Sequence, residues 1–115
     1  MTQHDDLLYL GHMLDVARDA LAIGRGKSAD DLSRDRTAQF AVAYALQIIG
    51  EAARSVSAER KAGMPDVPWT KIIGMRHRLV HNYSEIDLKL VSDTVAYDLE
   101  PLIRALEKVV PESPP

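Results

Sequence analysis

Apolar residues recur at steps of three and four along most of the chain, and runs that alternate with period two are scarce. Steps of three and four place side chains on one face of an α-helix, whereas alternation is typical of a strand. The pattern therefore predicts an all-α protein. The first apolar stripe consists of Leu7, Leu10, Leu14, Ala17 and Leu21, and Gly24 and Gly26 end that helix.

Two further helices are predicted in the middle of the chain. The segment 27–35 is polar and rich in Ser and Asp, which predicts a connecting loop. A helix over 36–57 follows, and its apolar stripe consists of Val42, Leu46, Ile49, Ala53 and Val56. The next helix begins near Pro68, because a proline lacks the N–H that would be unpaired in a first turn, and it runs to about Tyr83.

The last helix follows Asp87, a residue type suited to the N-cap. Pro101 interrupts this helix, because it removes one backbone hydrogen bond and clashes with the carbonyl of Tyr97. We therefore expect a kink or break near Leu99. The apolar stripe comprises Leu88, Val91, Val95, Leu99, Leu102, Leu106 and Val109.

Four helices with short links predict an up-and-down bundle. At 115 residues the chain has room for one domain, which we place at 1–110, with a frayed Pro-rich tail at 111–115. No apolar run is long enough for a membrane span, and the acidic start is unlike a secretory signal, so we expect a cytoplasmic protein. A core of this size is marginal, which favours a homodimer that buries one face.

The charge of the chain is unevenly distributed around a net value of −3. Residues 54–83 contain six basic and two acidic side chains, a local net charge of +4, and both flanking parts are acidic. Such a segment is either a solvated surface or a binding surface for a polyanion such as nucleic acid. Its basic side chains are Arg54, Arg60, Lys61, Lys71, Arg76 and Arg78, accompanied by His77 and His81.

The segment 69–83, W-T-K-I-I-G-M-R-H-R-L-V-H-N-Y, holds an arginine within an apolar stripe. On an ideal helix Arg76 shares a face with Ile72 and Val80, where a bundle normally places leucine. A charge near a core needs a partner, because an unpaired buried charge is strongly destabilising. Either Glu51, which lies in an otherwise apolar run, pairs with Arg76, or the arginine faces an anionic ligand.

Two histidines, His77 and His81, stand four residues apart in the same segment. This spacing can hold a metal ion, but the zinc-protease pattern requires a glutamate where Arg78 stands, so we expect neither a metal nor another cofactor. Alternatively, one histidine acts as general acid or base while Arg76 neutralises a phosphate. An ideal helix separates Arg76 and His81 by about 140°. A shared ligand then requires a helix that loosens near Asn82, a long reach of the arginine, or a composite cleft between two copies.

At these residues the sequence resembles the HepT-like proteins of the HEPN superfamily, whose helical domains carry an R-x4-6-H motif, often R-x4-H-x-Y in HepT. The matching residues are Arg76, His81 and Tyr83. Other similar features are the run Q-I-I-G-E-A-A at 47–53, Pro68 and Trp69, the run I-G-M-R at 73–76, and Asp87. The ordered combination is specific, and the resemblance covers about residues 3–108.

The resemblance implies a homodimeric bundle of four to five helices with the motif at the dimer cleft. It implies a metal-independent ribonuclease that acts on tRNA or mRNA as the toxin of a toxin-antitoxin pair. Arg76 and His81 match the residues that cleave RNA in this family, and His77, which stands where the family often has Asn, is an auxiliary candidate. Tyr83 matches the tyrosine to which an MntA-like nucleotidyltransferase antitoxin attaches AMP.

The other cations of the basic segment are expected to hold the RNA backbone, which makes affinity depend on salt. They are Arg54, Arg60, Lys61, Lys71 and Arg78. Two alternatives have other functions. One is a catalytically inactive HEPN scaffold that binds a nucleotidyltransferase, and the other is a structural helical dimer in which Arg76 pairs with Glu51 and Tyr83 fills the core.

Overall fold

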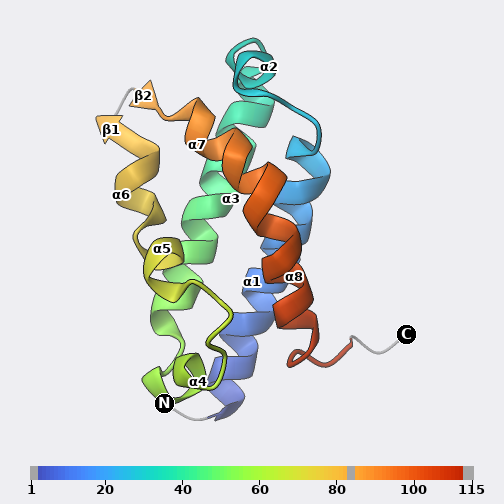
Figure 1. Cartoon of the computed structure of the whole chain (residues 1–115), viewed down its shortest axis with the longest axis vertical. Coiled ribbons are helices and arrows are strands. Elements are labelled where there is room, and N and C mark those ends of the chain that lie inside the picture. Colours follow the sequence, from blue (N-terminus) through green and yellow to red (C-terminus); the bar gives the residue numbers. More distant parts are fainter. Residues whose placement is uncertain (1–2, 83–84, 113–115) are drawn as a thin grey trace.

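The computed structural model describes residues 3–82 and 85–112, with side chains at 5–79 and 85–112. Regular structure in these residues is almost all helical, which confirms the predicted all-α class (Figure 1). In chain order the elements are α1 (Gln3–Gly24), α2 (Ala29–Ser33), α3 (Arg36–Ser55), α4 (Ala58–Ala62), α5 (Trp69–Ile73), α6 (Met75–Leu79), β1 (Val80–Asn82), β2 (Glu85–Ile86), α7 (Leu88–Asp93), the π-helical turn η1 (Thr94–Asp98) and α8 (Leu99–Glu107).

The helices form four columns that run alternately up and down, as predicted (Figure 1). The columns are α1, α3, the pair α5 and α6, and the run α7, η1 and α8. The molecule extends over 42 × 33 × 20 Å, so it is a flattened bundle. No helix in the described part of the chain is both long enough and apolar enough to cross a membrane.

The two long helices α1 and α3 pack along each other at the centre of the bundle. The apolar stripes predicted for them lie in one core, where each fully buried leucine or valine contributes about 1.5–3 kcal/mol relative to an exposed one. Buried alanines of α3 such as Ala45 and Ala52 allow its neighbours to approach closely. The buried stripe residues are Leu10, Leu14, Ala17, Val42, Leu46, Ile49, Ala53 and Val56.

The connection between α1 and α3 is not a plain loop, because it contains the five-residue helix α2. Ser28 and Asp31 form a reciprocal capping box, in which the Ser28 Oγ accepts from the Asp31 N–H and the Asp31 carboxylate accepts from the Ser28 N–H. Helix α3 ends at Ser55, two residues earlier than predicted. The chain turns there because the Ser57 hydroxyl instead caps α4 by accepting from the Arg60 N–H.

The last column begins where the sequence predicts, and it has an irregular turn just before Leu99. Asp87 caps α7, and its carboxylate accepts from the Leu90 N–H at 3.0 Å. The irregularity expected from Pro101 is the π-helical turn η1, which ends where the Leu99 N–H donates to the Thr94 carbonyl. Proline has no N–H for the carbonyl of Tyr97, so the preceding turn widens at little cost.

The third column departs from the prediction of one helix over 69–83. Gly74 ends α5, a second short helix α6 follows, and the chain becomes extended after Leu79. The cause is tertiary, because the Asp87 N–H donates to the Leu79 carbonyl at 2.7 Å and holds the chain in a hairpin. In that hairpin β1 and β2 pair antiparallel with an irregular register, Val80 opposite Ile86 and Asn82 opposite Glu85.

Candidate functional site

The R-x4-H segment lies at the junction between a helix and a strand. Arg76 and His77 belong to α6, whereas the backbone of His81 lies in β1 (Figure 1). The helix therefore loosens before His81, and the divergence of about 140° calculated for an ideal helix does not apply. The side chain of His81 and the whole of Tyr83 lie outside the described residues, so their roles stay predictions.

Arg76 faces solvent, which corrects the expectation that it points into the core. The side chain is 63% exposed. Because Gly74 interrupts the helix, the apolar face is taken up again by Met75 and Leu79, which are both buried, and the arginine between them faces outward. A guanidinium in this position remains free to meet an anion that approaches from solvent.

The partner of Arg76 is Glu51, as one of the two interpretations predicts. The Arg76 Nη1 donates to the Glu51 Oε1 at 3.4 Å, and the Glu51 side chain is 52% exposed. An ion pair this exposed contributes only about 0–1 kcal/mol to stability. The pair therefore orients the guanidinium without binding it tightly.

The neighbouring glycine explains how Glu51 comes so close to the R-x4-H segment. A Cβ added at Gly50 would stand 2.8 Å from the backbone oxygen of Ile72, a distance that real Cβ atoms do not tolerate. Helix α3 and helix α5 thus cross backbone against backbone at Gly50. This close crossing places the next residue of α3 beside the first turn of α6.

His77 is the histidine of the segment whose side chain is described. It is exposed on α6, and its backbone N–H donates to the Gly74 carbonyl at 3.2 Å. Over the residues with described placement, no group of three or more His, Asp or Glu could hold a metal ion. An auxiliary contact of His77 with a phosphate stays a prediction.

The five cations expected to hold RNA backbone are spread over the molecule. Arg54 is exposed on α3, three residues after Glu51, and Arg78 is exposed on α6, two residues after Arg76. Arg60 and Lys61 belong to α4, at the end of the bundle opposite the β1–β2 ribbon (Figure 1). The structure thus puts two of the five on the same elements as the ion pair.

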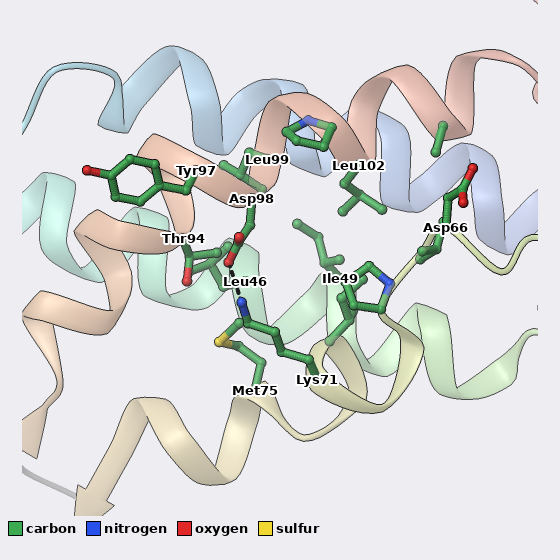
Figure 2. A pocket seen from close by; sticks show the side chains of 15 residues that line it. Leu46, Ile49, Asp66, Lys71, Met75, Thr94, Tyr97, Asp98, Leu99 and Leu102 are labelled. Atoms are coloured by element: carbon green, nitrogen blue, oxygen red, sulfur yellow. Dashed lines mark hydrogen bonds and ion pairs between the residues drawn. The ribbon is translucent and has the colours of Figure 1, made fainter.

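Lys71, the fifth of these cations, stands at the edge of an apolar hollow of about 200 Å³. Figure 2 shows its ammonium paired across the hollow with Asp98, at 2.9 Å. Leucines and isoleucines of α3 and α8 form much of the lining, and so does Met75, the residue before Arg76. Lys71 can therefore reach a phosphate only by leaving Asp98.

A buried polar contact lies far from the R-x4-H segment, and no sequence pattern predicted it. Asp6 is 2% exposed, and its carboxylate accepts from the Ser57 N–H at 2.8 Å and from the Ser57 hydroxyl at 2.6 Å. These hydrogen bonds hold the pKa of Asp6 below its ordinary value of 3.8. The contact fastens α1 to the N-cap of α4.

Two aromatic residues on α3 are further features that sequence analysis missed. Phe40 and Tyr44 are exposed although they are large. Their exposure could have been predicted from their position around the helix, because both fall outside the buried stripe of Val42, Leu46 and Ile49.

The fold and the site together define a class: a small helical bundle that presents an R-x4-H segment at a helix-to-strand junction. The sequence matches the family described as ribonuclease HepT-like over residues 13–109, so the chain belongs to the HepT-like ribonuclease family. This match confirms the predicted resemblance and the predicted enzyme class, a ribonuclease.

Individual relatives agree with the family. A protein of Methanocaldococcus jannaschii named as a candidate RNase is 29% identical over 109 residues, covering 95% of this chain and 100% of its own length. A Thermococcus cleftensis protein named "Probable ribonuclease HepT" is 36% identical over 80 residues, which are 70% of this chain and 73% of the relative. No solved structure matches the chain significantly.

Proposed function

We propose that the protein is a metal-independent endoribonuclease that cleaves tRNA or mRNA in the cytoplasm as the toxin of a toxin-antitoxin pair. One observation carries the proposal. The Arg76 guanidinium is exposed and, among the described residues, is held only by a surface carboxylate; it stands five residues before His81, where the helix ends and the strand begins. A scissile phosphate that approaches this junction meets a cation that is already oriented.

In the proposed reaction the RNA supplies its own nucleophile. The 2′-hydroxyl attacks the adjacent phosphorus, a new O2′–P bond forms, and the P–O5′ bond breaks. His81 takes the proton of the 2′-hydroxyl, and the leaving 5′-oxygen receives a proton from water or from His77. The products are a 2′,3′-cyclic phosphate and a 5′-hydroxyl. General base assistance of this kind contributes roughly 10² to 10⁴ in rate.

Arg76 stabilises the extra negative charge of the pentacovalent phosphorane. A donor aimed at a charge that develops only in the transition state contributes on the order of 10² to 10³ in rate. The guanidinium must exchange Glu51 for the phosphate as the substrate binds. That exchange costs little, because the ion pair is exposed to water.

The antitoxin partner in this proposal is an MntA-like nucleotidyltransferase that transfers AMP from ATP to the phenol oxygen of Tyr83, with release of pyrophosphate. The family match and the position of Tyr83 two residues after His81 support the assignment. An adenylated phenol adds bulk and negative charge to the R-x4-H-x-Y motif and so repels RNA. Mass spectrometry of the co-expressed protein should then show added adenylate on Tyr83.

The cleavage experiment uses the purified full chain in EDTA with tRNA and mRNA. We expect cleavage by the wild type, a loss of roughly 10² to 10⁴ in His81→Ala, and an unchanged helical circular dichroism spectrum. His12→Ala is the matched control, because His12 is an exposed histidine of α1. Retained cleavage in His81→Ala would remove His81 from the mechanism. A wild type that binds a nucleotidyltransferase but leaves both RNAs intact would instead identify the inactive scaffold.

A further inference from the structure

The hollow beside Lys71 is a cavity that the proposed reaction does not use. Its volume is about 200 Å³, and it is lined mainly by residues of α3, α5, η1 and α8 (Figure 2). An apolar cavity of about 150 Å³ is large enough to hold a benzene molecule. The hollow therefore has room for one aromatic ring with a short substituent.

Most of the wall of the hollow is apolar. Leu46 and Ile49 come from α3, Leu99 and Leu102 come from α8, and all four are buried. An apolar ligand placed between them would remove its own surface and theirs from water, which is the main driving force for binding in such a cavity. The body of a matching ligand is therefore apolar.

The polar side chains of the wall offer hydrogen-bond acceptors. Asp98 accepts from the Lys71 ammonium through Oδ2 at 2.9 Å, and its Oδ1 has no hydrogen bond to any residue whose side chain is described. The Thr94 hydroxyl donates to the Leu90 carbonyl at 2.7 Å, so toward the hollow it can only accept. Asp66 adds a second carboxylate. One lysine and two aspartates give the lining a net charge of −1, which favours a cationic ligand.

The two members of the ion pair differ in how readily they can leave the hollow. Lys71 has a long side chain that is 43% exposed and can turn into solvent, whereas the short side chain of Asp98 keeps its carboxylate at the wall. Separating this exposed pair costs little. An incoming ammonium can thus take the place of Lys71 on Asp98. An incoming carboxylate would remain beside a negative charge that cannot move away.

The hollow lies on a different side of α3 from the candidate site. At 100° per residue, Leu46 and Ile49 point about 140–160° away from Glu51 around the helix. A second copy placed across the Glu51–Arg76 pair therefore need not cover the hollow. A homodimer with the R-x4-H segments in one cleft is compatible with a ligand at this position.

We propose that the hollow is a binding site for a small primary amine with an aromatic body. The ring lies between the apolar side chains of α3 and α8, and the ammonium donates to the Asp98 carboxylate, with Thr94 as a further acceptor. The site is separate from the ribonuclease reaction, because Lys71 is the only lining residue with an expected contact to RNA.

The test follows the methyl signals of the ¹³C-labelled full chain by NMR during titration with 2-phenylethylamine. We expect saturable shifts for Leu46, Ile49 and Leu102, and no shift for Leu8, which is 65% exposed on α1. The comparison ligand is 3-phenylpropionate, which has the same ring and linker but a carboxylate in place of the ammonium. It should bind at least about tenfold more weakly, because it lacks the charged hydrogen bond to Asp98.

Variants of the ion pair should act in opposite directions. Asp98→Asn removes the negative charge that holds the ammonium and should weaken binding of 2-phenylethylamine roughly tenfold. Lys71→Ala removes the competing ammonium and should strengthen this binding. Asp93→Asn is the matched control, because Asp93 pairs with Lys89 at 2.7 Å and does not line the hollow.

Absence of shifts at Leu46 and Ile49 would overturn the site itself. Equal affinity for the amine and the carboxylate would overturn its assignment to amines, and so would an unchanged amine affinity in Asp98→Asn or an equal loss in Asp93→Asn. If Asp98→Asn does not fold, Lys71→Ala decides, since amine binding that is not strengthened would contradict the exchange at Asp98. None of these measurements involves RNA cleavage, so failure of the nuclease proposal would leave them unaffected.

Discussion

In the proposed mechanism, Arg76 must exchange its carboxylate partner for the scissile phosphate, so the exposure of its side chain matters. A buried Arg76 would be committed to Glu51, because separating a buried ion pair is strongly unfavourable. The observed pair is exposed on both sides, so the carboxylate competes only weakly with an incoming phosphate. Glu51 acts in this view as a local anion that holds the guanidinium in place until RNA arrives.

Replacing that carboxylate tests the exchange. Glu51→Gln should raise the affinity for 2′-O-methyl RNA, by up to roughly fivefold, because the phosphate no longer competes with a negative charge. The free energy of unfolding should change by no more than about 1 kcal/mol. Glu59→Gln is the control, since it removes an exposed charge from α4, at the end of the bundle opposite the β1–β2 ribbon (Figure 1).

A large loss of stability in Glu51→Gln would contradict this view. It would show that the ion pair is a structural contact, as in the alternative of a purely structural dimer.

At the scale of elements, a buried polar contact joins the long helix α1 to the N-cap of the short helix α4. Asp6 of α1 accepts two hydrogen bonds from Ser57, the N-cap of α4, and these bonds lower its pKa. A carboxyl group with a lowered pKa in the folded state stabilises the fold above its unfolded pKa. That stabilisation is lost as the pH falls through the lower, folded value.

The Asp6→Asn variant separates this effect from the other carboxylates. It should be less stable than the wild type at neutral pH, and the difference should shrink as the pH falls below 3.8, because the unfolded wild-type chain then takes up a proton on Asp6 before the folded protein does. Asp31 and Asp35 also have lowered pKa values, but both residues are present in the wild type and in the variant, so their contributions cancel in the difference in unfolding free energy. Denaturant midpoints across the pH range provide the measurement, and a gap that stays constant down to low pH would contradict the role of the ionised carboxylate.

Local sequence signals predicted those elements whose ends are set locally. The apolar stripes, the Asp87 cap and the effect of Pro101 all act within one or two turns of a helix. The break of the third column did not follow from them, because the stripe from Trp69 to Tyr83 fits a single helix. Its end at Leu79 depends on a hydrogen bond from Asp87, eight residues further on.

The same distinction holds for the site. The pairing of Glu51 with Arg76 could be predicted, because it required only a carboxylate in an apolar run and an arginine in need of a partner. The exposure of the pair was not predicted, because the stripe from Trp69 to Tyr83 fits one helix, whereas Gly74 ends α5 and changes the phase of the residues that follow. The exposure of Phe40 and Tyr44 was not predicted, although both lie outside the apolar stripe of α3.

At the scale of the whole molecule, the flattened shape spreads the basic residues over different regions. The bundle is 42 Å long, and α4 with Arg60 and Lys61 lies at the end opposite the β1–β2 ribbon. These residues cannot bind the phosphate at Arg76, so they can only hold more distant parts of an RNA. We propose that the protein is a homodimer in which the R-x4-H segments of the two copies line one cleft. The small core and the family match support this proposal.

The measurement that bears most directly on the central claim is the RNA cleavage rate of Arg76→Ala compared with Arg78→Ala. Both variants remove an exposed arginine from the same short helix, so they change net charge and helix content equally. We expect Arg76→Ala to lose on the order of 10² to 10³ in rate and Arg78→Ala to stay within a few-fold of the wild type at low salt. Equal rates in the two variants would contradict a role for Arg76 at the scissile phosphate.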